Sequence, residues 1–170
     1  MNYRILFVAL LIFSGSMYAQ SENVESLKKA PNFQLENLDG DLISLKENLG
    51  NGPILLSFWA TWCKPCIEEL GHIQKIYSSL EKNGLKVFAI STDNEKSVAK
   101  VKPFIKSSNY DFTVLLDTDG ETARDYFTVA VPFTVILDKN GKIVYTHSGY
   151  KKGDELKVEE IIKNLLENKS

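Results

Sequence analysis

The chain contains two cysteines, Cys63 and Cys66, which lie in the run Trp62-Cys63-Lys64-Pro65-Cys66. A disulfide between them would constrain the unfolded chain very little, because the entropy of loop closure grows with loop length. A purely structural crosslink is therefore a poor explanation for the pair. Thiol–disulfide exchange and metal binding remain as the chemistry that two thiols at this spacing could perform.

Metal binding would need more ligands than the cysteines supply, since a structural zinc site takes four. The only histidines are His72 and His147. On a helical wheel His72 lies about 120° from Cys66, which predicts a solvated position off the apolar side. His147 is expected to end a strand and to be structural. We therefore favour redox exchange and expect neither a metal nor another cofactor.

The two thiols are expected to differ in reactivity. Pro65 is typical of the first turn of a helix, where its missing N–H is not needed. Cys63 would then lie at the helix N-terminus, where free N–H groups and the helix dipole favour a thiolate. We expect Cys63 to be the accessible nucleophile. Cys66, one turn further on, would be the shielded thiol that resolves the mixed disulfide.

A buried strand and a long helix are expected to position the pair. The apolar run Ile54–Trp59 is typical of a central strand. The helix is predicted to continue to Asn83-Gly84, because glycine is a common C-terminal stop. Its predicted core-facing stripe consists of Cys66, Leu70, Ile73, Tyr77 and Leu80.

Two acidic residues follow Cys66 on the same helix and are predicted to face different ways. Glu69 lies about 60° from Cys66 on the wheel, at the edge of the apolar stripe. Glu68 lies about 160° away and should face water. Both could simply complement the positive end of the helix dipole. For Glu69 we favour a function at the cysteines.

The rest of the chain predicts alternating strands and helices. The turn Asp39-Gly40 is expected to join a hairpin over Phe33–Glu36 and Leu42–Leu45. Further strands are predicted over Leu85–Ser91, Phe112–Leu116, Phe133–Leu137 and Ile143–His147, and helices over Glu95–Ser107 (bent at Pro103), Glu121–Tyr126 and Asp154–Asn168. This order predicts an α/β fold with a central mixed sheet flanked by helices.

The first residues have the layout of a secretory signal peptide. Arg4 precedes the apolar run Ile5–Phe13, and small residues follow up to Ala19. A membrane-spanning helix needs about 20 apolar residues, so a stable anchor is the weaker interpretation. We expect residues 1–19 to be a cleaved signal peptide, 20–29 a flexible lead-in and 30–170 one domain. The protein would then work in the periplasm or another extracytoplasmic compartment.

The charge of the chain argues against nucleic acid and membrane surfaces as its binding partners. The formal net charge is −2, and no cluster of basic residues is present to bind nucleic acid or a membrane surface. We expect a monomer whose partners are other proteins.

The sequence around the cysteines resembles a known family. The run Phe58–Cys66 is similar to the active-site sequence of the thioredoxin superfamily, and the wider pattern resembles its ResA/TlpA-like branch of extracytoplasmic thiol–disulfide oxidoreductases. The resemblance covers about residues 30–168. It includes Ala30-Pro31-Asn32-Phe33, Asp39-Gly40, Val131-Pro132-Phe133-Thr134 and Leu137-Asp138-Lys139-Asn140-Gly141-Lys142. It implies a thioredoxin-like fold with an αβ insertion over Glu95–Leu116, ahead of a cis-proline.

The resemblance also implies roles for particular residues. The Val131–Pro132 bond would be cis and would lie beside the disulfide, where Trp62, Val131 and Pro132 would dock the substrate. Glu69 matches the acidic residue that this branch keeps near its cysteines. Three positions depart from the pattern. Ser57 replaces the buried acid of thioredoxin proper, Gly71 replaces a usual proline, and Ala130 replaces a frequent glycine.

The resemblance favours a reductase of periplasmic disulfides, with apocytochrome c among the possible clients and a membrane thiol–disulfide protein as electron donor. The alternative is a disulfide oxidase or isomerase. Strong oxidants of this kind commonly place a histidine between the cysteines, whereas this chain has Lys64. A thiol peroxidase would need an arginine near its cysteine, and Arg124 is the only one beyond the signal segment. A copper or haem carrier would have to recruit His147.

Overall fold

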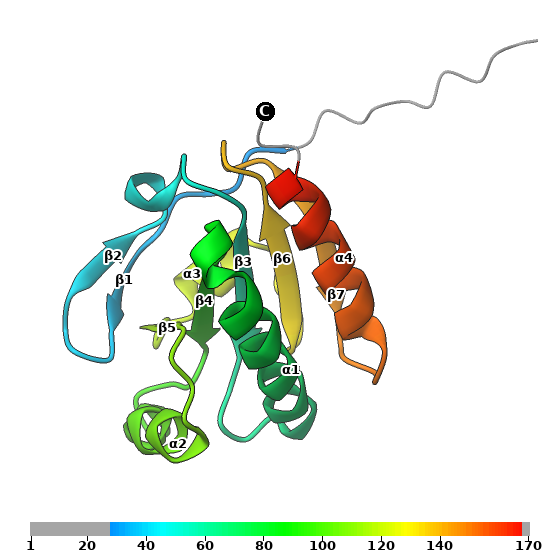
Figure 1. The fold of residues 1–170 in the computed structure, drawn as a ribbon. Helices are drawn as coiled ribbons and strands as arrows, with labels where there is room; N and C mark the ends of the chain where they lie inside the picture. Colours follow the sequence, from blue (N-terminus) through cyan, green and yellow to red (C-terminus); the bar gives the residue numbers. More distant parts are fainter. Residues whose placement is uncertain (1–27, 168–170) are drawn as a thin grey trace, which may run out of the picture.

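The computed structural model describes residues 28–167, which form one seven-stranded sheet with helices on both faces (Figure 1). The predicted signal peptide and residues 20–27 of the predicted lead-in lie outside the described residues. The last two residues of that lead-in already pair with the sheet. The N–H of Ile143 donates to the Lys28 carbonyl at 3.0 Å, and Lys29 forms an antiparallel bridge with Lys142.

The sheet is mixed, as the sequence predicts. Its strand order is β2-β1-β5-β4-β3-β6-β7, with β3, β4 and β5 parallel and every other neighbouring pair antiparallel. The strands are β1 (Gln34–Asn37), β2 (Leu42–Ser44), β3 (Ile54–Trp59), β4 (Lys86–Ser91), β5 (Thr113–Leu116), β6 (Phe133–Leu137) and β7 (Ile143–Ser148). The predicted hairpins at both ends of the chain are thus confirmed, and β5 is the strand of the predicted αβ insertion.

Four α-helices cover the sheet. Within the described residues they are α1 (Lys64–Leu80), α2 (Val101–Ser108), α3 (Glu121–Asp125) and α4 (Asp154–Glu167). Three short 3-10 turns lie between other elements: η1 (Lys46–Asn48) precedes β3, η2 (Glu81–Asn83) follows α1, and η3 (Val98–Lys100) precedes α2. The α-helix α1 ends at Leu80, earlier than predicted, and η2 continues the helical turns to Asn83. Gly84 then ends the helical segment at the predicted place, because it adopts the left-handed conformation at φ 101° that glycine tolerates. The end predicted for the last helix, Asn168, lies just beyond the described residues.

The helix predicted over Glu95–Ser107, with a bend at Pro103, begins later than expected. Residues 95–97 form turns, residues 98–100 form η3, and α2 begins only at Val101. Pro103 therefore lies in the first turn of α2, where a backbone N–H has no partner within the helix. A proline there starts a helix and requires no bend.

The core lies on both sides of β3, whose six residues are all buried. One cluster combines alternate strand residues with α1, α2 and α4, and it includes Leu55, Cys66 and Ile162. The other lies against α3 and includes Phe58 and Tyr126. This two-sided burial holds β3 in the middle of the sheet, so that its end delivers the chain to the start of α1.

The buried face of α1 differs from the predicted stripe. Cys66, Leu70 and Ile73 are buried as expected, but Ile76 and Glu69 are buried as well. The predicted members Tyr77 and Leu80 are only half-buried. The reason is α4, which packs along α1 and covers the side that carries Ile76.

Candidate active site

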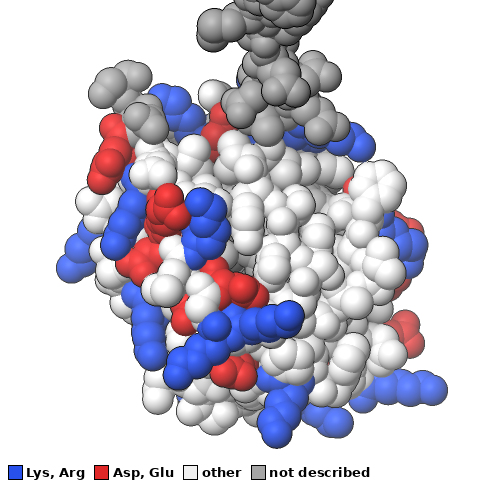
Figure 2. Space-filling model, turned by 90° about the vertical axis from the view of Figure 1, so that its right-hand side faces the viewer, with Lys and Arg blue, Asp and Glu red and all other residues white. Residues whose placement is uncertain are grey.

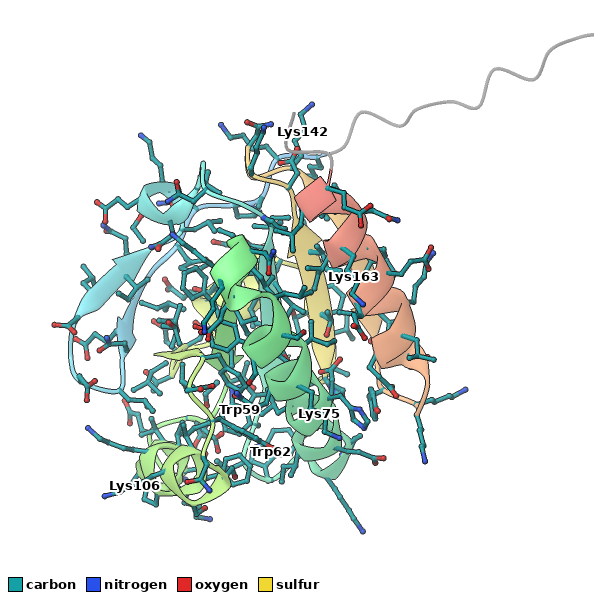
Figure 3. The ribbon with its side chains drawn as sticks, viewed as in Figure 1. Trp59, Trp62, Lys75, Lys106, Lys142 and Lys163 are labelled. Carbon is teal, nitrogen blue, oxygen red and sulfur yellow. A yellow bond between two sulfur atoms is a disulfide. The ribbon has the colours of Figure 1, made fainter. Side chains whose placement is uncertain are left out.

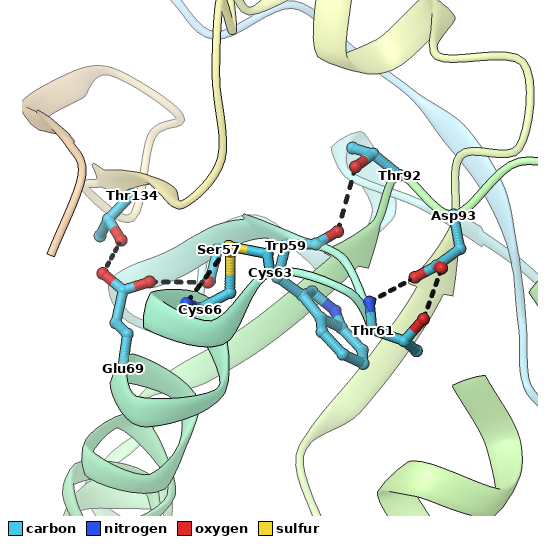
Figure 4. The surroundings of a disulfide bond; sticks show 9 residues. All are labelled: Ser57, Trp59, Thr61, Cys63, Cys66, Glu69, Thr92, Asp93 and Thr134. Atoms are coloured by element: carbon cyan, nitrogen blue, oxygen red, sulfur yellow. Dashed lines mark hydrogen bonds between the residues drawn. A yellow bond between two sulfur atoms is a disulfide. The ribbon is translucent and has the colours of Figure 1, made fainter. Parts of the chain in front are cut away.

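The two cysteines form a disulfide at the N-terminus of α1 (Figure 4), with their sulfur atoms 2.03 Å apart. Cys63 is the N-cap residue, and its Sγ accepts a hydrogen bond from the Cys66 backbone N–H at 3.3 Å. Cys63 is 5% exposed and Cys66 is fully buried. Cys63 is therefore less accessible than predicted, although it is the one of the two that solvent reaches.

Two tryptophans near the disulfide lie in contrasting environments at this end of the molecule (Figure 3). Trp62, directly before Cys63, is 68% exposed, whereas Trp59 at the end of β3 is fully buried and packs against Phe104 with ring centroids 5.4 Å apart. An exposed tryptophan beside a redox pair provides a large apolar surface for a partner.

The predicted cis peptide bond between Val131 and Pro132 is confirmed. Pro132 is buried directly before β6. Val131 is half-buried and packs against the cluster that contains both cysteines. The loop before β6 and the start of α1 are thus brought to the same region of the fold, as the predicted docking role requires.

Glu69 is buried at 5% exposure, deeper than the rim position that the helical wheel predicts. Its carboxylate accepts hydrogen bonds from the Thr134 hydroxyl at 2.7 Å and from the Ser57 hydroxyl at 3.3 Å (Figure 4). Glu69 therefore reaches the place on β3 where thioredoxin proper has its acid and this chain has Ser57. Glu68 is exposed, as predicted.

The pKa of Glu69 is raised above its usual value of 4.5, chiefly because burial disfavours the charged carboxylate. The hydrogen bonds from Thr134 and Ser57 and the nearby His147 act in the opposite direction but do not cancel the burial. Glu69 and Cys66 are three residues apart and so lie on adjoining parts of the helix surface. A raised pKa makes the carboxylate a stronger base, so it is suited to accept a proton from a neighbouring thiol.

A second buried acid, Asp93, positions the loop that carries Trp62 and Cys63. Its carboxylate accepts from the Thr61 backbone N–H at 2.7 Å and from the Thr61 hydroxyl at 2.6 Å. The Ser91 hydroxyl donates a third bond at 3.0 Å. Burial alone would raise the pKa of Asp93, but these hydrogen bonds outweigh it and hold the pKa below its usual value. The sequence reading missed this residue, because an isolated Asp after a strand carries no distinctive pattern.

The two histidines pair with different acidic residues of α4. His72 lies off the buried stripe of α1, as predicted, with its side chain 26% exposed and its Nδ1 3.6 Å from Glu155. His147 lies near the end of β7, as predicted, with its Nε2 3.0 Å from an Asp154 oxygen. Within residues 28–167, no group of three or more His, Cys, Asp or Glu side chains is arranged to hold a metal ion.

The remaining departures from the family pattern leave the disulfide undisturbed. The Gly71 position is open, since an added Cβ would meet only the Tyr110 hydroxyl at 3.6 Å. Ala130 is exposed. Arg124 is exposed and bonds the Asp119 carbonyl, so it does not supply the arginine that a peroxidase would need at its cysteine.

Comparisons with known proteins agree with this geometry. Residues 27–146 match the model of the AhpC/TSA family. The chain is 34% identical to the thiol–disulfide oxidoreductase ResA of Bacillus cereus over 95% of this chain and 96% of that protein. No helix within the described part of the chain has both the length and the apolar character to cross a membrane.

Solved structures show the same likeness. A protein of Chlorobium tepidum assigned as the thiol:disulfide interchange protein DsbE superposes with a TM-score of 0.76 at 29% identity, covering 82% of this chain and 96% of that one. StoA from Bacillus subtilis gives 0.64 at 29% identity, covering 76% and 96%. The chain therefore belongs to the AhpC/TSA family of thioredoxin-like proteins and, within it, to the ResA-related thiol–disulfide oxidoreductases.

Proposed function

We propose that this protein is an extracytoplasmic reductase that uses the dithiol form of Cys63 and Cys66 to reduce disulfides in client proteins. The observation that carries the proposal is the redox pair at the N-terminus of α1 with a buried carboxyl group, Glu69, one turn further along the helix. The N-terminal position favours a thiolate on Cys63, and Glu69 supplies a proton acceptor next to Cys66.

The reaction proceeds in two exchanges. The Cys63 thiolate attacks one sulfur of the client disulfide, forms a mixed disulfide, and releases the other client sulfur as a thiolate that takes a proton from water. Cys66 then gives its proton to Glu69 and attacks Cys63. The disulfide of Cys63 and Cys66 forms, and the second client sulfur leaves as a thiolate. The client gains two electrons, and the enzyme pair loses two.

The client docks against the exposed apolar surface beside the disulfide. Trp62 provides a ring that is largely open to solvent, and Val131 and Pro132 bring the loop before β6 to the same region. An extended peptide placed there would present its disulfide to Cys63. Apocytochrome c fits this role, because its haem-attachment sequence is a C-x-x-C-H motif whose cysteines must be reduced before haem is attached.

The compartment and the electron donor follow from the same chemistry. Residues 1–19 have the layout of a secretory signal, and extracytoplasmic compartments are oxidising. A reductase in such a compartment must be re-reduced after each turnover. A membrane thiol–disulfide protein that carries electrons across the membrane is the partner that we propose for this step.

The reduction potential of the pair tests the direction of electron transfer. A strong oxidant stabilises its reduced thiolate, whereas the negative charge of Glu69 disfavours thiolates nearby. We therefore expect a potential below about −220 mV, in the range of thioredoxin and the glutaredoxins, when the protein is equilibrated with glutathione or dithiothreitol buffers. A potential near about −120 mV, as in the strong oxidant DsbA, would instead identify an oxidase.

A further inference from the structure

A small cavity adjoins Glu69 between α1, the sheet and the start of α4. Its volume is about 10 Å³, and its polar lining comes from Glu69, Thr134, His147, Tyr150, Asp154 and Glu155. This is about the smallest space that can hold a single water molecule. Most of the cavity surface is apolar, so the hydrogen-bond partners of such a water would come from the few polar side chains in its lining. The cavity offers a path for a proton out of an otherwise buried site.

The register of the sheet places His147 beside Glu69. Thr134 on β6 pairs directly with His147 on β7, so the two side chains leave the sheet on the same face. The Thr134 hydroxyl bonds the Glu69 carboxylate at 2.7 Å, which brings His147 next to the same carboxylate. The electrostatic effect of His147 lowers the pKa of Glu69, consistent with this closeness.

His147 also reaches solvent and is held from the other side. Its side chain is 34% exposed, and its Nε2 lies 3.0 Å from Asp154 at the start of α4. The ring stacks on Tyr145 of the same strand at an interplanar angle of 15°. Tyr150 and Glu155 are the remaining titratable groups that line the cavity, and they are hydrogen-bonded to each other at 2.9 Å.

The outer surface near α4 carries both signs of charge. On this face Lys and Arg side chains are interspersed with Asp and Glu over the left-hand half, beside a broad area without charges (Figure 2). Because charges of both signs are mixed on this face, its electrostatic potential should neither concentrate protons nor repel them.

We propose that His147 carries protons between Glu69 and solvent, through one water molecule in the cavity, while Asp154 holds the imidazole in position. The proposal rests on the proposed function, because it requires that Glu69 accepts the proton of Cys66. The relay is part of the resolving step: as Cys66 gives its proton to Glu69, Glu69 passes a proton through the water to His147, which releases a proton to solvent. Glu69 returns to its carboxylate form, and no other bond is made or broken.

This role suits the chemistry of the residues. A histidine takes up and releases protons near neutral pH. A carboxylate such as that of Asp154 stabilises the imidazolium form during the transfer. Because His147 acts on the reaction through Glu69, it is a positioning and relay residue rather than a catalytic one.

The two exchanges can be timed separately with dithiobis(nitrobenzoic acid). The reduced protein releases one coloured thionitrobenzoate when Cys63 attacks and a second when Cys66 resolves, so stopped-flow absorbance reports both steps. In weak buffer, we expect His147→Asn to leave the first phase unchanged and to slow the second about ten-fold or more, as part of the roughly 10²–10⁴-fold that general acid–base catalysis contributes. Added imidazole should restore the second phase, because it carries protons by diffusion in place of the missing ring.

Two further variants, His72→Asn and Glu69→Gln, distinguish the relay from other causes of a slow second phase. His72→Asn is the control. His72 is also a half-buried histidine and pairs with Glu155, but His72 itself does not line the cavity. This variant should leave both phases unchanged. An unaltered second phase in His147→Asn, or a slow one that imidazole does not restore, would overturn the relay. Glu69→Gln separates the two proposals. If Glu69→Gln leaves the second phase unchanged, the proposed function of Glu69 is itself wrong, whereas a slow second phase that ignores imidazole supports both.

Discussion

The packing around Glu69 raises the pKa of its carboxyl group, and this shift makes it a better proton acceptor for Cys66. Its position three residues after Cys66 places it on the helix surface next to that thiol, and α4 together with β6 buries it from bulk solvent. Burial raises the pKa, while the hydroxyl groups of Ser57 and Thr134 still solvate the carboxylate. The carboxylate is thus a stronger base than an exposed glutamate and still keeps its hydrogen bonds.

Replacing Glu69 by Gln tests the influence of this charge on the cysteines. In the wild-type protein the carboxylate disfavours a nearby thiolate, so the pKa of Cys63 should be higher than without it. We expect Glu69→Gln to lower the apparent pKa of Cys63 by up to about one unit, which is an energy difference of about 1.4 kcal/mol. The measurement is the rate of thiol alkylation against pH in the reduced protein.

Glu68→Gln is the control for this experiment. Glu68 lies one residue earlier in α1 and is exposed, so water and salt screen its charge. It should shift the alkylation profile very little. If the two variants give the same profile, Glu69 acts only as a complement to the helix dipole.

The sequence could identify Glu69 but could not place it correctly. The spacing from Cys66 and the serine at position 57 both pointed to it. The helical wheel set it at the rim, because the apolar stripe was centred on residues within α1 alone. Its burial depends on α4 and β6, which lie far along the chain, and a periodicity within one helix contains no information about them.

At the scale of elements, the loop between β3 and α1 depends on an acid from the neighbouring strand. β3 and β4 run in parallel, so both end at the same edge of the sheet. Asp93 follows β4 by two residues and bonds Thr61, which precedes Trp62. This contact fixes the segment that delivers the cysteines. It could not be predicted without knowing that β3 and β4 are neighbours.

Asp93→Asn should destabilise the protein, because an amide cannot accept all the bonds that the carboxylate receives. We expect a loss of about 2 kcal/mol in the free energy of unfolding at neutral pH, measured by urea denaturation. The pKa of Asp93 is lowered from 3.8 in the folded state, so its stabilising effect is fully present above pH 3.8. It is lost as the pH falls through the lowered pKa.

The difference in stability between the wild type and Asp93→Asn should therefore shrink in acid. Glu95→Gln is the matched control, because Glu95 is an exposed acid two residues away and should leave stability within about 0.5 kcal/mol of wild type. A difference for Asp93→Asn that stays constant down to low pH would show that its ionisation plays no part.

At the scale of the whole molecule, the sequence predicted the elements better than their arrangement. Local signals were sufficient for the buried strand Ile54–Trp59, for both hairpins and for the glycine that ends the helical segment of α1 and η2. The order of the strands was not accessible in this way. Nothing in the sequence of β1 indicates that it pairs with β5, because strand pairing depends on contacts between distant segments.

The sheet order explains why the site lies where it does. β3 is central and buried on both faces, with β4 on one side and β6 on the other. β4 brings Asp93, β6 brings Thr134, and α1 begins between them. The cysteines, their proton acceptor and the loop that holds them therefore depend on one continuous core.

Trapping of mixed disulfides tests the central claim, that Cys63 attacks and Cys66 resolves. Reduced Cys66→Ser and Cys63→Ser variants would be incubated with a peptide that carries an oxidised C-x-x-C-H motif, and the products identified by mass spectrometry. The account predicts that Cys66→Ser accumulates the peptide on Cys63, because the resolving thiol of the enzyme is missing, while Cys63→Ser captures almost none through the buried Cys66. Equal trapping by the two variants, or more on Cys66, would contradict it.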